Sequence, residues 1–171
     1  MNRPFLLFIA VFIVMALSNA IVPVLPFLSD DLSFQTLIFS AYFFGAMVST
    51  LPAGIASDRY GQPVLIRVSM GLTLLTGILI VTLTDPVDLL VWRFIEGVAA
   101  GIFVSSALSW IGYQEDTLKN TGFFMASLNF GLLSGLIGSG WLTQISGEIL
   151  LGAFVCTLIT EIVFLFILVH K

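Results

Sequence analysis

The chain has 171 residues, of which 58% are hydrophobic and only 9% are charged. A water-soluble domain of this size cannot bury so much apolar surface, so the composition excludes an ordinary soluble protein. The formal net charge of −4 does not indicate an acidic soluble protein either, because the charged residues cluster between long apolar runs.

Six apolar runs are long enough to cross a bilayer as helices, because a hydrocarbon core of about 30 Å requires about 20 apolar residues. The first run continues to Phe27 and five more follow it, so we interpret it as a span and not as a cleaved signal peptide. The expected fold is an all-α membrane protein, a single bundle over residues 1–171. Its transmembrane helices are predicted at roughly 5–28, 34–57, 64–84, 87–111, 121–145 and 149–169.

The first span contains Asn19, followed by Pro23 and Pro26. Proline lacks the backbone N–H that continues a helical hydrogen-bond ladder, so it permits a bend in the span. Asn19 is a polar residue inside an apolar run. It either lines a cavity or hydrogen-bonds a neighbouring helix.

The basic residues in the loops and near the ends of the spans predict the orientation of the bundle. With six spans, one side of the membrane receives Arg3, Arg59, Arg67, Lys119 and Lys171. The opposite loops contain no base and carry Asp30, Asp31, Asp85, Asp88 and Glu148. Since Lys and Arg are retained on the cytoplasmic side, both termini are expected in the cytoplasm of a cell whose plasma membrane holds the protein.

The two halves of the chain resemble each other when one is shifted by 86 residues. The shift brings Phe44, Gly45, Gly54 and Gly61 onto Phe130, Gly131, Gly140 and Gly147. Three spans separate the copies, so the second copy crosses the membrane in the opposite direction. The pattern predicts a 3+3 inverted repeat, approximately 1–85 and 86–171, as in many secondary transporters. Chance matching of glycines is the alternative.

A charged turn after the second span contains Gly54, Asp58, Arg59 and Gly61. Gly54 would let two helices approach closely, Asp58 and Arg59 would end the apolar span at the membrane surface, and Gly61 would permit a tight turn. An ordinary charged loop is the alternative.

This segment resembles the signature between the second and third helices of major facilitator superfamily transporters, and the chain as a whole resembles the amino-terminal half of such a transporter. Gln62 and Pro63 occupy positions that are usually basic in the family. The resemblance implies a secondary transporter that moves a small solute by alternating access, and so not an enzyme. It also implies that the turn acts as a cytoplasmic latch, and that the Asn19 position, often acidic in proton-coupled members, belongs to the cavity or coupling site.

The fourth span contains Arg93, Glu96 and Gly97 and is similar to a second family signature, in which an arginine precedes a glycine by four residues. Each charge inside a membrane costs about 2.5 to 3.5 kcal/mol on insertion scales, so such residues usually face protein or water. Arg93 and Glu96 are three residues apart and lie on one helix face. They form either a structural ion pair or a coupling site for protons or substrate.

The fifth span contains Gly131, Gly135 and Gly140. This spacing is similar to the glycine motif associated with antiporters of the superfamily, although Leu136 and Ser139 replace residues of that motif. The resemblance favours an antiporter that exports its solute. Protons are the coupling ion considered for this export. Close helix packing is the alternative.

The sequence predicts no cofactor, no metal site and no nucleic-acid binding, because it has one histidine, one cysteine and six scattered bases. The expected partners are membrane lipid, a small-molecule solute and a second six-helix half. That half would be another copy of this chain or a separately encoded one, since substrate sites of this family lie between two such bundles. The alternative function is a non-transporting membrane scaffold or interaction protein derived from a transporter half.

Overall fold

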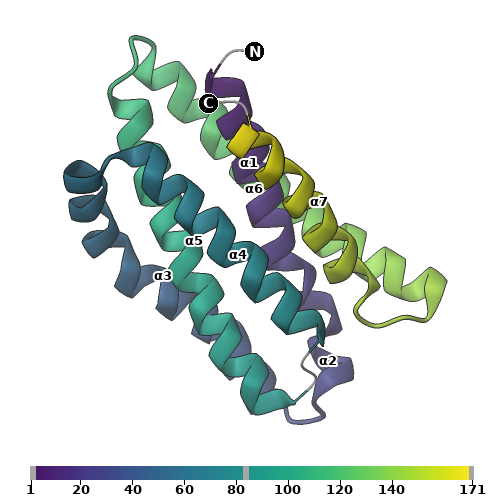
Figure 1. Cartoon of the computed structure of the whole chain (residues 1–171). Coiled ribbons are helices and arrows are strands. Elements are labelled where there is room, and N and C mark those ends of the chain that lie inside the picture. Colours follow the sequence, from purple (N-terminus) through teal and green to yellow (C-terminus); the bar gives the residue numbers. More distant parts are fainter. Residues whose placement is uncertain (1–2, 83–84, 170–171) are drawn as a thin grey trace.

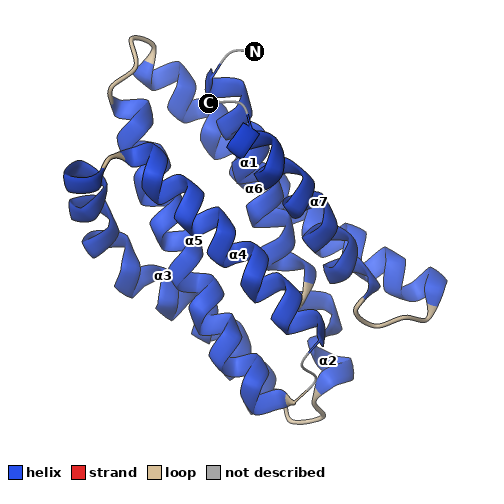
Figure 2. Cartoon of the chain, in the orientation of Figure 1, coloured by secondary structure: helices blue, strands red, loops and turns tan. Residues whose placement is uncertain are grey.

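The computed structural model describes residues 3–82 and 85–169, and within these ranges the chain is helical with short connections and no strand (Figures 1 and 2). The elements are α1 (Arg3–Ala20), the 3-10 helix η1 (Val22–Val24), α2 (Leu25–Leu28), α3 (Leu32–Tyr60), α4 (Gln62–Thr82), α5 (Pro86–Gly112), α6 (Thr117–Ser146) and α7 (Leu151–Val169). The all-α prediction is confirmed. Each predicted span coincides with one long helix, except that the first comprises α1, η1 and α2.

Four helical segments of the described chain are long and apolar enough to cross a membrane: Pro4–Leu28, α3, α4 and α6. The last predicted span is apolar over a shorter stretch, Leu151–Leu165. The fourth predicted span, α5, has 27 residues and includes three charged ones, Asp88, Arg93 and Glu96. The protein is therefore a membrane protein, while the complete six-span topology stays a prediction.

Polar loop residues and glycines fix the ends of these helices. The side chain of Asp31 accepts a hydrogen bond from the Ser33 backbone N–H at 2.8 Å, and Asp85 caps α5 in the same way. Such caps satisfy N–H groups that the first turn of a helix leaves unpaired. At the other ends, Gly61 follows α3 with φ +91° and Gly147 follows α6 with φ +74°, a backbone region that glycine adopts without strain.

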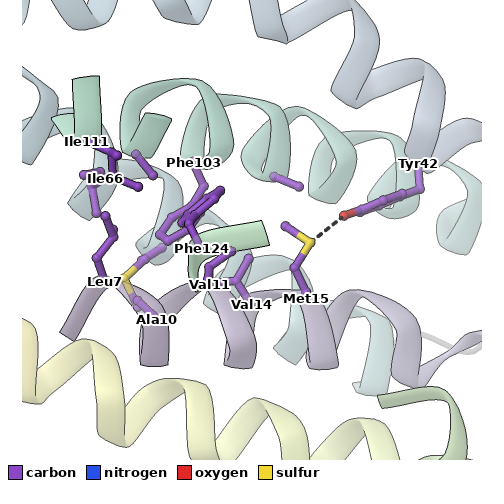
Figure 3. Close-up of a cluster of buried hydrophobic side chains, with 13 residues drawn as sticks. Leu7, Ala10, Val11, Val14, Met15, Tyr42, Ile66, Phe103, Ile111 and Phe124 are labelled. Carbon is purple, nitrogen blue, oxygen red and sulfur yellow. Dashed lines mark hydrogen bonds between the residues drawn. The ribbon is translucent and has the colours of Figure 1, made fainter. Parts of the chain in front are cut away.

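The bundle is organised around α1. Its core cluster joins α1 to α4, α5 and α6 through residues such as Val11, Met70, Phe103 and Phe124, all of them fully buried (Figure 3). The most extensive helix pairs are α3 with α5 and α1 with α6, and α7 packs against α1, α4 and α6 (Figure 1).

Glycines allow the two main helix pairs to pack backbone against backbone. A Cβ atom at Gly97 would collide with the Tyr42 backbone of α3, and one at Gly135 would collide with the Ala16 backbone of α1. Such close approach favours dispersion contacts, which drive helix association where lipid is as apolar as the side chains. The glycines of α5 and α6 therefore determine how these helices dock.

Candidate functional site

The site is centred on two charged residues buried in the bundle. Arg93 and Glu96 both lie on α5, each side chain is only 1% exposed, and Arg93 Nη1 lies 2.5 Å from Glu96 Oε2. Taking two charges out of water costs several kcal/mol per ion unless they are paired and hydrogen-bonded. The attraction between the two paired charges offsets part of this desolvation cost.

Two further contacts hold the guanidinium of Arg93. Its Nη1 donates to the Ser18 carbonyl of α1 at 2.8 Å, and its central carbon lies 4.7 Å from the centroid of the Tyr42 ring on α3. The Arg93 Nε atom is buried and has no hydrogen-bond partner in the described part of the chain. The ion pair thus connects α1, α3 and α5 at one point.

The Ser18 carbonyl lies beside a break in the first span. α1 ends at Ala20, the chain turns through η1, and Pro23 has no N–H to bond the carbonyl of Asn19, the residue next to Ser18. Carbonyls in the last turn of a helix need partners from outside the helix. Arg93 serves Ser18, and the Ser139 hydroxyl of α6 donates to the Ala20 carbonyl at 2.5 Å. The break is therefore held from two sides.

Asn19 lies in the same turn and is partly buried. Its Nδ2 atom donates to the Leu132 carbonyl of α6 at 3.0 Å, which is the neighbouring-helix hydrogen bond considered from the sequence. The structure thus brings Asn19, Arg93 and Glu96 to the break in the first span. Gly97 lies beside them, where it contacts the backbone of Tyr42.

The charged turn forms a second and separate group. Asp58 is exposed at the end of α3 and accepts a hydrogen bond from Ser109 of α5 at 3.3 Å, and the Arg59 guanidinium lies 5.6 Å from the Tyr60 ring centroid. Asp58 is sixteen residues beyond Tyr42 on the same helix, about 24 Å at 1.5 Å per residue. It cannot contact the buried ion pair directly.

The expectation that Gly54 brings two helices together is not met within the described chain. A Cβ atom at Gly54 would meet no described atom within 4 Å, because the glycine does not lie on the side of α3 that packs against α5. In α6, Gly131 and Gly135 do pack against the α1 backbone, and a Cβ at Gly140 would lie 3.4 Å from Pro23 Cβ.

Sequence reasoning did not identify Ser18, Tyr42 or Ser139 as site residues. Ser139 was considered only as a replacement within the glycine motif, and its hydroxyl in an apolar helix was the signal that could have indicated a partner. Tyr42 gave no such signal, because a tyrosine in a membrane span is usually a packing residue. No group of three or more metal-ligating side chains occurs among the described residues.

Comparison with known families gives one finding. The sequence model of the Major Facilitator Superfamily matches residues 7–171, which is nearly the whole chain. A search of curated proteins found no match.

Proposed function

The chain belongs to the Major Facilitator Superfamily, and from this membership we propose that it is one six-helix half of a secondary transporter that moves a small solute by alternating access. The observation that carries the proposal is the family match, which runs from within α1 to the end of the chain. Members of this family are transporters and not enzymes, so the scaffold alternative is not favoured.

We propose that the half is itself a 3+3 inverted repeat. Two features support this arrangement. First, α3 packs on α5 as α6 packs on α1, and these pairs exchange under the 86-residue shift. Second, a Cβ at Gly45 would collide with the Phe94 carbonyl and lie 3.0 Å from the Val98 backbone nitrogen, while one at Gly131 would collide with the Phe12 backbone. The shift relates Gly45 to Gly131 and Phe12 to Val98, so the two interfaces use equivalent positions.

The coupling step is assigned to Arg93 and Glu96. Proton binding by Glu96 would remove its negative charge, which leaves Arg93 held by the Ser18 carbonyl and the Tyr42 ring alone. Because Ser18 precedes the break in the first span, a change in the ion pair would alter the support of that break. Helix breaks at bundle interfaces are where transporter folds build their substrate and ion sites.

Asp58, Arg59 and Gly61 are assigned a different role, as a latch at the cytoplasmic end of α3. The exposure of Asp58 and Arg59 and the distance of Asp58 from the ion pair support a role in the conformational balance and not in solute binding. The orientation that follows from the basic residues places this turn and both termini in the cytoplasm and the protein in the plasma membrane.

The second six-helix half would dock on α3 and α6. Over the most apolar 18 residues of each segment, only 28% of α3 and 17% of α6 is buried inside the bundle, against 61% for Pro4–Leu28. Both expose long apolar side chains, among them Met47, Leu51, Phe130 and Trp141. The glycine set of α6 favours an exporter that exchanges its solute for protons.

The test is reconstitution in liposomes that contain a pH-sensitive dye. Small organic cations and amphiphiles would be added on either side, and a proton flux that depends on the solute supports coupled transport. Glu96→Gln should abolish the flux, while Glu115→Gln, an exposed loop residue, should leave it unchanged. Native mass spectrometry of the same sample determines whether a second half is bound. A folded lone monomer that moves no solute would refute the proposal.

A further inference from the structure

We propose that the outer face of α7 is an interface between two copies of this chain, with Glu161 of each copy at its centre. The face is distinct from the exposed sides of α3 and α6, so the inference does not depend on transport or on the second half described above. Figure 1 shows α7 on the outside of the bundle, beside α1.

The position of Glu161 indicates that this face of α7 has a protein partner. It is the eleventh residue of the 19-residue helix α7, hence near the middle of an apolar segment, and it is exposed. No ion pair or hydrogen bond joins its carboxyl group to another described residue. A carboxyl group exposed to hydrocarbon is unfavourable, and intramembrane acids therefore almost always face protein or water.

Four of the exposed residues around Glu161 form a regular seam. Phe154, Leu158, Glu161 and Leu165 follow each other at spacings of 4, 3 and 4 residues, within a broader face of α7 that also exposes Ile159 and Ile162. The opposite side of α7 is buried through Ala153, Thr157 and Thr160. A spacing that averages 3.5 residues is the pattern of a helix that packs lengthwise against a second helix.

The polar position within this seam favours a second copy as the occupant. A symmetric dimer whose axis runs along the membrane normal places each residue at the same depth as its own counterpart. Two carboxyl groups complement each other when they are protonated, because each then donates one hydrogen bond and accepts one. A single polar residue in an apolar helix seam also specifies how many helices associate and in which register they pack. Glu161 meets both conditions, whereas leucines alone give little preference for protein over lipid.

The interface can be tested by cysteine cross-linking of the full-length chain in liposomes at low protein density. In a Cys156→Ala background, Leu158→Cys and Leu165→Cys place single cysteines on the seam on either side of Glu161. Leu75→Cys on α4 is the matched control, because Leu75 is 50% exposed and Leu158 is 43% exposed. We expect both seam cysteines to form disulfide-linked dimers at least ten times faster than the control under mild oxidation.

The carboxyl group is tested in the same background. Glu161→Gln keeps a side chain that donates and accepts, so cross-linking at Leu158→Cys should persist. Glu161→Leu removes both hydrogen bonds and should lower the dimerisation constant about tenfold, the size expected for two interhelical hydrogen bonds in a membrane.

Three results would overturn the proposal: equal rates at the seam and control positions, an unchanged dimer in Glu161→Leu, or cross-linking at Met47→Cys of α3 in place of the seam. The comparison of cysteine positions is made with Glu161 intact, so it decides the interface even if the leucine variant fails to fold.

Discussion

Removing the charge of Glu96 should destabilise the bundle far more than removing the whole ion pair. Glu96→Gln leaves the Arg93 guanidinium 1% exposed without its counter-ion. Loss of one partner from a buried pair costs about 3 to 5 kcal/mol, because the remaining charge stays buried. Arg93 retains the Ser18 carbonyl and the Tyr42 ring, and a desolvated cation–π contact contributes up to about 2 kcal/mol. We therefore expect a loss at the lower end, about 3 kcal/mol.

The double variant Arg93→Met with Glu96→Leu removes both charges, places apolar side chains at both positions and fills much of the same volume. Its unfolding free energy should lie within about 1 kcal/mol of the wild type, since buried pairs can often be replaced by apolar residues at little cost. The assay is unfolding in mixed micelles of dodecyl maltoside and dodecyl sulfate, followed by circular dichroism. A loss below about 1 kcal/mol for Glu96→Gln, on the scale of an exposed pair, would refute the reasoning.

The double variant also separates the two roles considered for the ion pair. If Arg93 and Glu96 are only structural, the stable double variant should still transport the solute. If they couple transport to protons, it should fold and show no proton flux in the liposome assay. Flux at the wild-type rate would exclude the coupling role.

Three further changes test the remaining assignments. Gly135→Ala should lower the free energy of unfolding in detergent by about 1 to 3 kcal/mol through overpacking. Gly138→Ala is the control and should have no such effect, because a Cβ there meets nothing within 4 Å. Equal effects of the two variants would contradict the packing role of Gly135. Ser139→Ala removes a buried donor and should cost about 1 kcal/mol, while Ser134→Ala, whose exposed hydroxyl bonds its own helix, should cost nothing measurable in the same unfolding assay. Asp58→Asn should slow transport in initial-rate assays with little change in solute affinity, and a loss of solute binding would make the latch assignment wrong.

The positions of the long helices could be predicted from the sequence because apolar run length has a direct physical meaning in a bilayer. The ends were less accurate: α3 starts at Leu32 and α6 at Thr117, before the predicted starts at 34 and 121. The reason is local. Polar residues that do not belong in hydrocarbon still extend a helix beyond the membrane, and a cap such as Asp31 then determines where the helix begins.

The candidate site could be predicted only in part. Arg93 and Glu96 were identifiable because two charges three residues apart in an apolar run require a partner. Their contacts with Ser18 and Tyr42 were not, since these residues are 75 and 51 positions away from Arg93 and meet it only through helix packing. A Cβ at Gly54 meets no described atom within 4 Å, which the sequence could not foretell because glycine spacing indicates close packing but not which side of the helix has a neighbour.

The two main helix interfaces also differ in a way that bears on the mechanism. Asn19 of α1 donates to a backbone carbonyl of α6, and Ser105, its equivalent under the 86-residue shift, donates to the Thr50 carbonyl of α3 at 2.9 Å. The two donors are thus at equivalent positions, although their acceptors Leu132 and Thr50 differ by four residues in register. The first span is broken near Pro23, while its equivalent α5 continues as one helix from Pro86 to Gly112. The buried charges lie on the unbroken helix, and Arg93 donates to the Ser18 carbonyl of the broken one. Arg93 stays in place on the continuous helix α5 and supports the break in the first span. A change in its ion pair with Glu96 can therefore alter the bend of the first span without moving α5. For this reason we assign coupling to Arg93 and Glu96 and not to Asn19.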